Sequence, residues 1–218
     1  MTDLSALAVG VLGGTGPQGR GLAYRWAAAG IRVVLGSRTA DRAVAAASEL
    51  GSDRVTGASN ATCASAADVV VAAVPWDGHG DTLRSLAGTL AGKILVDCVV
   101  PMGFDTQGPY PLRVEEGSAA EQARALLPDT TVTAAFHHVS ATLLGDPSVE
   151  ELDCDVLVLG DDRAATDLVR ALADAIPGMR GIYGGRLRNA MQVETLTCNL
   201  IAINRRYQSH TGIRITNL

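Results

Sequence analysis

The chain has 218 residues and a formal net charge of −5, and 47% of its residues are hydrophobic. This length is enough for one good core, or for one domain with a small appendage. The acidic balance gives no general attraction to nucleic acid, and no uninterrupted apolar run is long enough to cross a bilayer. The start, Met1-Thr2-Asp3-Leu4, lacks the basic residues of a secretory signal. We therefore expect a cytoplasmic protein that binds neither nucleic acid nor a membrane.

The four cysteines are far apart in the sequence and form no CxxC pair. The spacing that zinc or iron–sulfur sites require is therefore absent, and we expect no metal. Cys98 and Cys154 fall in apolar strand-like runs and Cys198 in an apolar helical pattern. We interpret the cysteines as reduced, buried, small hydrophobic side chains.

Apolar strand-like runs alternate with helical patterns, which predicts a parallel sheet with crossover helices. The runs are rich in Val and Ile with little polar alternation, as in strands covered on both faces. The predicted strands span residues 6–12, 31–35, 55–57, 69–74, 93–97, 131–136 and 155–159. The predicted helices span residues 17–29, 40–50, 77–90, 119–127, 164–176 and 189–205.

The first predicted strand runs into a glycine cluster at the start of a helical pattern. Gly14-x-Gly16-x-x-Gly19 fits the dinucleotide-binding fingerprint. One glycine permits the tight turn, one lets the backbone approach a pyrophosphate, and one allows close packing of helix on strand. Free N–H groups at the helix N-terminus then favour the anion. The motif predicts a dinucleotide site of the Rossmann type.

The tip of the second predicted strand narrows the choice of cofactor. An NAD site usually has Asp or Glu there, whereas this chain has Ser37 and Arg38, with Arg42 one helical turn further on. Because Arg matches phosphate geometry and is always charged, the tip predicts binding of the 2′-phosphate of NADP. The alternative is an Arg that caps a surface turn. Asp41 is expected in the first turn of the next helix.

Two further regions bear on the architecture. Residues 101–117 are expected to form a long loop, either a binding loop or lid or else a surface excursion. The last strand is expected to end at Gly160, and the region after residue 177 has a helical pattern. We predict an α/β fold, a Rossmann-type doubly wound, mainly parallel sheet with a small helical C-terminal cap. Residues 1–177 would form the NADP-binding domain and residues 178–218 the cap over a cleft.

Several separate segments match one family in chain order. They are Leu12-Gly13-Gly14-Thr15-Gly16, Gly36-Ser37-Arg38, Val74-Pro75-Trp76, Val100-Pro101, Ser118-Ala119-Ala120-Glu121, His137, Gly160-Asp161-Asp162 and Val193-Glu194-Thr195-Leu196-Thr197. Through them the chain resembles the NADPH-dependent coenzyme F420 reductases, also called F420H2:NADP oxidoreductases. The resemblance runs from near residue 8 to Gly212-Ile213-Arg214. Glycine fingerprints and Ser-Arg tips are common, but their combination with the Val-Pro-Trp, Val-Pro and His segments is more specific.

The resemblance implies reversible hydride transfer between C4 of the nicotinamide of NADP(H) and C5 of the deazaflavin coenzyme F420. The family is usually homodimeric, so a homodimer is expected. The implied cofactor-binding residues are Gly14, Thr15, Gly16, Pro17, Gln18 and Gly19 for the pyrophosphate loop, Ser37, Arg38 and Arg42 for the 2′-phosphate, Val74 and Pro75 for the nicotinamide half, and Val100, Pro101, Val139, Gly212 and Ile213 for the deazaflavin.

His137 is implied as a hydrogen-bonding partner that positions the deazaflavin ring, against the alternative of a polar residue satisfied by backbone at a strand end. His138 stands where the family has a hydroxyl residue, so the phenolic and tail ends of the deazaflavin would be held differently. His138 itself is expected to be structural.

Two other functions fit the same N-terminal half. One is an NADPH-dependent reductase of another acceptor, such as a flavin, ferric iron or an imine. The other is a non-enzymatic sensor that binds NADP and signals to a protein. Only the Val100-Pro101 and His137 segments favour the deazaflavin over these alternatives.

Overall fold

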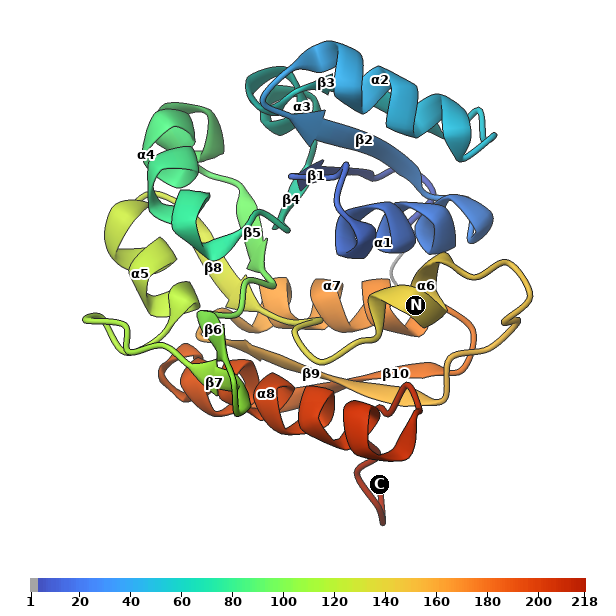
Figure 1. The fold of residues 1–218 in the computed structure, drawn as a ribbon. Coiled ribbons are helices and arrows are strands. Elements are labelled where there is room, and N and C mark those ends of the chain that lie inside the picture. Colours follow the sequence, from blue (N-terminus) through green and yellow to red (C-terminus); the bar gives the residue numbers. More distant parts are fainter. Residues whose placement is uncertain (1–3) are drawn as a thin grey trace.

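The computed structural model describes residues 4–218, and its centre is a sheet in the order β10-β9-β8-β5-β4-β1-β2-β3 (Figure 1). Every neighbouring pair of strands is parallel except β8 and β9, which are antiparallel. The strands are β1 (Ala8–Leu12), β2 (Arg32–Ser37), β3 (Val55–Ser59), β4 (Val69–Ala72), β5 (Ile94–Asp97), β8 (Thr131–Ala134), β9 (Cys154–Gly160) and β10 (Met179–Gly185).

Helices cover both faces of this sheet. One face carries α1 (Pro17–Ala28), α2 (Ala40–Glu49), α6 (Ala141–Gly145) and α7 (Arg163–Asp174), and the other carries α3 (Asn60–Ala66), α4 (His79–Leu90), α5 (Ala119–Leu126) and α8 (Ala190–Tyr207). Each face has its own buried apolar cluster. The predicted doubly wound, mainly parallel sheet is therefore confirmed. No helix among residues 4–218 has the length and apolarity to cross a membrane.

The order of the strands reverses between β1 and β4. From β1 the chain winds outward through β2 and β3, and after returning to β4 it winds the other way through β5 and β8. Ligands of open α/β sheets bind at such a switch point, outside the carboxyl ends of the strands. The topology therefore places the glycine motif after β1, the Ser-Arg tip after β2 and the Val-Pro segment after β4 at one edge.

The structure corrects two expectations about irregular regions. Residues 101–117 are not a loop without secondary structure, because β6 (Met102–Asp105) and β7 (Gly108–Pro111) form an antiparallel hairpin. Two prolines in β7 hide the strand pattern in the sequence. The hairpin is a separate two-stranded sheet, so these prolines do not interrupt the hydrogen bonds of the main sheet. Asp105 closes its turn by accepting hydrogen bonds from the N–H groups of Gln107 and Gly108.

The expectation that the last strand ends at Gly160 is also wrong. β10 adds a further parallel strand to the edge of the main sheet beside β9. Its sequence, MRGIYGG, is rich in glycine, which lowers strand propensity. The region after residue 177 thus begins as part of the main sheet and becomes helical only at η2 (Leu187–Asn189) and α8. The division into domains at residue 177 stays a prediction.

Two charged side chains fix helices to their neighbours. Arg25, buried in α1, donates to the carbonyl oxygens of residues 143, 144, 146 and 149 at 2.6–2.8 Å and so ties α6 and the loop after it to α1. Lys93, just before β5, donates from Nζ to the carbonyl oxygens of Ala64, Ser65 and Ala67 at 2.6–3.0 Å. The Lys93 ammonium therefore caps the carboxyl end of α3.

Candidate functional site

A cleft of about 750 Å³ lies at the switch point, at the carboxyl ends of β1, β2 and β4. It brings together nine of the predicted site residues from three separate segments of the chain, and no residue after Thr82 lines it. Its lining residues are Gly13, Thr15, Gly16, Pro17, Gln18, Ser37, Arg38, Arg42, Asn60, Ala73, Val74, Pro75, Asp77, Gly78 and Thr82.

The glycine motif sets how closely α1 approaches the sheet. A Cβ atom on Gly19 would lie 2.8 Å from the Cα atom of Gly14, so a side chain there would push the helix away. The left-handed backbone of the turn falls on Gly13, with φ +68°, one residue before the motif. Gly16 is the N-cap of α1 and offers no side-chain acceptor, and the first turn has no acidic residue. The N–H groups at this helix start are therefore directed at the cleft, ready for an anion.

The Ser-Arg tip forms the other corner of the cleft. Ser37 is the last residue of β2 and is buried, while Arg38 and Arg42 are exposed side chains at the start of α2. Within residues 4–218 neither arginine forms an ion pair with a carboxylate. Asp41 lies in the first turn of α2, as predicted. Two uncompensated guanidinium groups at one end of a cleft are suited to a phosphate.

Four polar or turn residues of the cleft were missed by the sequence analysis: Asn60, Asp77, Gly78 and Thr82. Asn60 begins α3, a seven-residue helix whose mixture of Ser, Thr, Cys and Asn gives no helical signal. The other three belong to η1 (Trp76–Gly78) and the first turn of α4, which the sequence predicted as one helix from residue 77. Proximity of these segments to β2 follows from topology rather than from any local motif.

A second group of predicted residues lies beside the cleft, where β5 and β8 end. Val100 and Pro101 follow β5, and His137 and Val139 follow β8, which is the strand next to it. The chain leaves β8 through Phe136, whose φ of +65° is unusual for a bulky residue. The Gln18 side chain donates to the Phe136 carbonyl oxygen at 3.0 Å. The phosphate loop and the His137 segment are thereby joined directly.

His137 is a buried histidine without a hydrogen-bonding partner for its ring. It is 5% exposed, and neither Nδ1 nor Nε2 has a partner within residues 4–218. Burial lowers its pKa to about 4, so the ring is neutral near pH 7. A neutral imidazole keeps one donor and one acceptor available. The alternative that backbone groups satisfy this ring is therefore contradicted.

His138 differs from its neighbour because its ring has contacts. Its Nε2 accepts from the Leu157 N–H at 3.4 Å, and Nδ1 lies 4.0 Å from the Cys154 sulfur. Burial lowers the pKa of His138 to about 4 as well. The expected structural role of His138 fits these contacts with β9, although both histidines lie in a turn beyond β8 rather than on the strand.

A buried ion pair at the end of β5 fixes the start of the segment that contains Val100 and Pro101. Asp97 at the end of β5 accepts from His79 Nε2 at 2.6 Å, and neither side chain is exposed to solvent. The His79 Nδ1 atom faces Gln122 Oε1 at 3.2 Å, so both ring nitrogens face acceptors and the geometry favours the imidazolium. Burial by itself would lower the pKa of His79, but the Asp97 carboxylate more than offsets this effect, so the pKa lies above its ordinary value. The second Asp97 oxygen accepts from the Val99 N–H at 3.0 Å and fixes the start of that segment.

Helix α8 reaches the same region with two polar side chains. Glu194, 2% exposed, accepts from the N–H groups of Ala119 and Ala120 at the start of α5, at 3.0 and 3.2 Å. Thr197 donates to the His137 carbonyl oxygen at 3.2 Å. Burial raises the pKa of Glu194 to about 7, against the two N–H groups, which lower it. The role of α8 in the site is therefore to hold α5 and the His137 segment, while it contributes nothing to the lining of the cleft.

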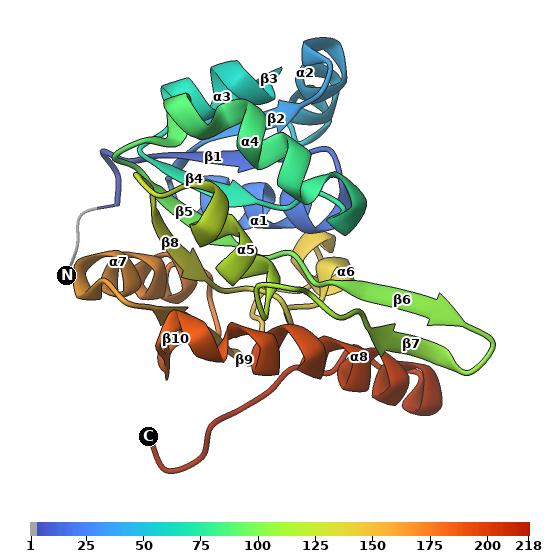
Figure 2. The same cartoon turned by 90° about the vertical axis from the view of Figure 1, so that its left-hand side faces the viewer.

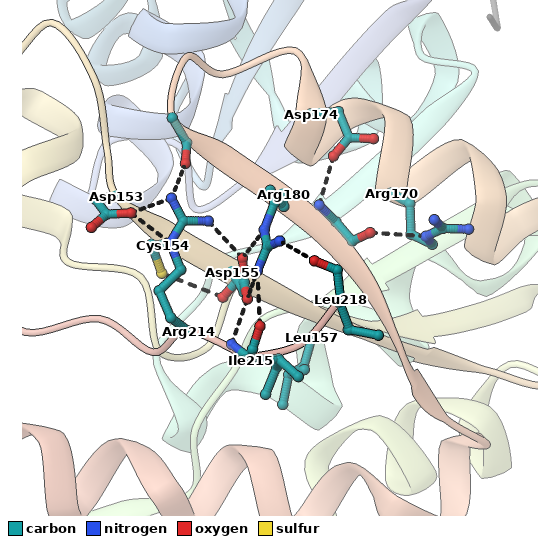
Figure 3. A network of polar contacts seen from close by, with 12 residues as sticks. Asp153, Cys154, Asp155, Leu157, Arg170, Asp174, Arg180, Arg214, Ile215 and Leu218 are labelled. Carbon is teal, nitrogen blue, oxygen red and sulfur yellow. Dashed lines mark hydrogen bonds and ion pairs between the residues drawn. The ribbon is translucent and has the colours of Figure 1, made fainter.

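The predicted residues Gly212 and Ile213 lie on the tail after α8. The Ile213 carbonyl oxygen accepts from the Asp155 N–H at 2.8 Å, and a Cβ atom on Gly212 would lie 2.9 Å from the Cys154 sulfur. The tail is held by the buried Asp155 carboxylate, which binds Arg180 and Arg214 at 2.7 Å and the Ile215 N–H (Figure 3). Hydrogen bonds from Arg180 keep the Asp155 pKa well below its usual range. The structure places Gly212 and Ile213 beside β9, away from the lining of the cleft.

The fold and the cleft define the class of the protein: a doubly wound dinucleotide-binding protein whose phosphate corner is basic. The family profile described as "NADP oxidoreductase coenzyme F420-dependent" matches residues 8–101. The F420-dependent NADP reductase of Methanothermobacter thermautotrophicus is 42% identical in an alignment that covers 100% of this chain and 98% of that enzyme. The chain belongs to the family of F420-dependent NADP reductases.

Two further similarities bear on this assignment. The crystal structure of a proposed F420-dependent NADP reductase from Arthrobacter sp. FB24 matches with a TM-score of 0.82 and 28% identity, covering 97% of this chain and 100% of that one. The rat metalloreductase STEAP3 is 34% identical over 88% of this chain, which spans only 37% of the length of that protein.

Replacing Glu194 with Gln is expected to flatten the dependence of stability on pH. Because burial raises the folded-state pKa from 4.5 to about 7, the folded chain keeps a proton that the unfolded chain releases between these values. The contribution of this carboxyl to stability is therefore largest below pH 4.5 and falls by about 3 kcal/mol as the pH rises to 7. Urea unfolding of wild type and E194Q between pH 5 and pH 7.5 measures the difference, and parallel pH profiles would contradict it.

Proposed function

We propose that the protein transfers a hydride reversibly between NADPH and the deazaflavin coenzyme F420. The observation that carries the proposal is a pair of arginines, Arg38 and Arg42, at one end of the switch-point cleft, which form no ion pair with a carboxylate among residues 4–218. The Val100-Pro101 and His137 segments lie beside the other end of the cleft. The name of the Methanothermobacter relative supports the same pair of coenzymes.

The cleft residues fit a dinucleotide. The N–H groups at the start of α1 would bind the pyrophosphate, since Gly16 and the first turn supply no competing acceptor. Ser37, Arg38 and Arg42 would hold the 2′-phosphate, and Val74-Pro75 would pass the nicotinamide half toward β5. The Gln18 side chain donates to the Phe136 carbonyl oxygen, which fixes its position at the start of α1, and its backbone N–H would be available to the phosphate.

The segments after β5 and β8 fit the second ring. Pro101 and Val139 are buried and Val100 is half-buried, which gives an apolar surface for a planar heterocycle. When both coenzymes are bound, they supply the hydride chemistry from nicotinamide C4 to deazaflavin C5. The protein keeps the two rings in contact and excludes water. Neutral His137, with no partner of its own, would hydrogen-bond the deazaflavin ring and position it.

The remaining features of the proposal concern the assembly and the setting. Residues 178–218 would close the deazaflavin side, with Gly212 and Ile213 near the ring. A second copy would cover the exposed apolar side chains on the hairpin and α8, where these two elements project together (Figure 2). These apolar side chains are Phe104, Tyr110, Ile203 and Tyr207, which are 38–73% exposed. Nucleic acid is not expected as a partner, and the cytoplasm is the expected compartment.

Ferric iron is a second candidate acceptor because of the likeness to the rat metalloreductase, which matches this chain over 37% of its own length. The alignment covers 88% of this chain, so it extends well beyond the dinucleotide-binding half, and the two acceptors are distinguished by measured rates.

Mixing the protein with NADPH and oxidised coenzyme F420 is expected to bleach the deazaflavin absorbance with turnover. The same mixture with chelated iron(III) is expected to react at least about 100-fold more slowly, because iron(III) offers no flat ring that could be aligned within about 3.5 Å of the nicotinamide. Riboflavin is the control for a flat ring that differs from the deazaflavin. Stopped-flow absorbance measures each rate under anaerobic conditions. Faster reduction of iron(III) than of the deazaflavin would favour the second candidate and contradict the proposal.

Replacing Arg38 with Asp is expected to lower the preference for NADPH over NADH, measured as the ratio of kcat/KM values, by about 100-fold. The change removes a charge-assisted hydrogen bond and adds a repelling carboxylate, together about 3 kcal/mol. Arg163→Asp, at a side chain that is 95% exposed on α7, is the matched control and should keep the ratio. An unchanged ratio in R38D would show that the 2′-phosphate is bound elsewhere.

The protein is expected to be a dimer in dilute solution, as measured by light scattering after gel filtration. Ile203→Asp is expected to shift it toward the monomer, because a carboxylate would be buried without a partner at the interface. A monomeric wild type, or an I203D variant that stays as dimeric as wild type, would remove this surface from the proposal.

A further inference from the structure

Asn60 is a cleft residue with an unusual environment. It lines the same cleft as Ser37, Arg38 and Arg42, although it comes from β3 and α3 rather than from the strand tip. In the register of the sheet Ser59 pairs with Ser37, so Asn60 follows directly beside the Ser-Arg tip. The residue thus stands at the phosphate corner of the cleft from the side of the neighbouring strand.

The two ends of its amide differ. The Oδ1 atom is buried and has no hydrogen-bonding partner within residues 4–218. Among residues 4–218 Nδ2 has no partner either, and it is not among the buried atoms, so the NH2 group is the accessible end of this cleft-lining side chain. A buried acceptor without a partner costs about 1–3 kcal/mol, so this orientation of the amide requires an explanation.

Gly36 explains how the amide is held. A Cβ atom on Gly36 would lie 2.8 Å from Asn60 Oδ1, so the oxygen rests against the Cα atom of that glycine. A Cα–H group is a weak donor to such an oxygen. Cys63 closes the other side, with its Cβ 3.0 Å from the same position and its thiol donating to the Val34 carbonyl oxygen. The amide oxygen is thus packed against Gly36 and Cys63, and the NH2 group is the end of the amide that is not buried.

We infer that Asn60 is a specificity-determining residue that donates a hydrogen bond from Nδ2 to the 2′-phosphate of NADP(H). An amide whose oxygen is sequestered acts toward the cleft as a donor only, which matches an acceptor-only phosphate. The inference rests on the proposed NADP site. Its consequence is that three elements, the end of β2, α2 and the start of α3, would surround the phosphate.

The test compares two probes that differ only in the 2′-phosphate: adenosine 2′,5′-bisphosphate and AMP, titrated by calorimetry. The Asn60→Leu variant keeps the size of the side chain and removes its donor. It is expected to bind the bisphosphate about 10-fold more weakly than wild type, as for loss of one hydrogen bond to a charged group. Its affinity for AMP should stay within about twofold of wild type.

A second variant and a control complete the design. Asn60→Asp keeps the shape and presents a carboxylate, so it is expected to weaken bisphosphate binding more than N60L does. Asn199→Leu, at an exposed position on α8, controls for the loss of a surface amide. Thermal melting of each variant checks that the fold is kept.

The outcomes separate this inference from the proposed function. Equal losses for both probes in N60L would mean that Asn60 shapes the cleft or binds the nucleoside, and would overturn the inference. Unchanged affinities for both probes would also overturn it. If wild type itself fails to prefer the bisphosphate, and R38D changes nothing, the NADP site fails and takes the inference with it. None of these measurements depends on reduction of the deazaflavin.

Discussion

The site depends on one steric constraint, the absence of side chains where α1 crosses the end of β1. With Gly19 within contact of the Gly14 backbone, the start of α1 comes close enough to direct its N–H groups at the cleft. The remaining parts of the cleft are arranged around that helix start. Ser37 and Arg38 reach it from the neighbouring strand, and Val74-Pro75 reach it from the strand on the other side of the switch point.

The second half of the site is organised by buried and half-buried polar groups. The Asp97–His79 pair fixes the segment after β5, and Gln18, Thr197 and the turn at Phe136 fix the segment after β8. A buried ion pair of this kind is weak support for stability, because the desolvation of both charges offsets their attraction. The ion pair instead fixes the position of the backbone, because the carboxylate that binds His79 also accepts a hydrogen bond from the Val99 N–H. Polar networks that are fully satisfied specify one arrangement of the backbone.

Much of the fold and the basic corner of the cleft could be predicted because the signals are local. The glycine motif and the Ser-Arg tip each follow from a few adjacent residues. β10 and the hairpin escaped prediction because Gly and Pro weaken strand patterns at positions where pairing with a neighbour decides the structure. His79 and Glu194 escaped because their partners lie far away in the sequence. Asn60 escaped because only the pairing of β3 with β2 brings it beside the Ser-Arg tip. Helix α8 was predicted, but its last turns expose the apolar side chains of Ile203 and Tyr207.

Strand β5 is only four residues long, and its two ends hold opposite parts of the molecule. Lys93, just before the strand, donates hydrogen bonds to the carboxyl end of α3. Asp97, at the end of the strand, binds His79 of α4 and the Val99 N–H. A tilt of this one strand would therefore disturb α3, α4 and the segment after β5 at the same moment. We expect the strand to be among the least mobile parts of the molecule, because both of its ends are held by hydrogen bonds to other elements.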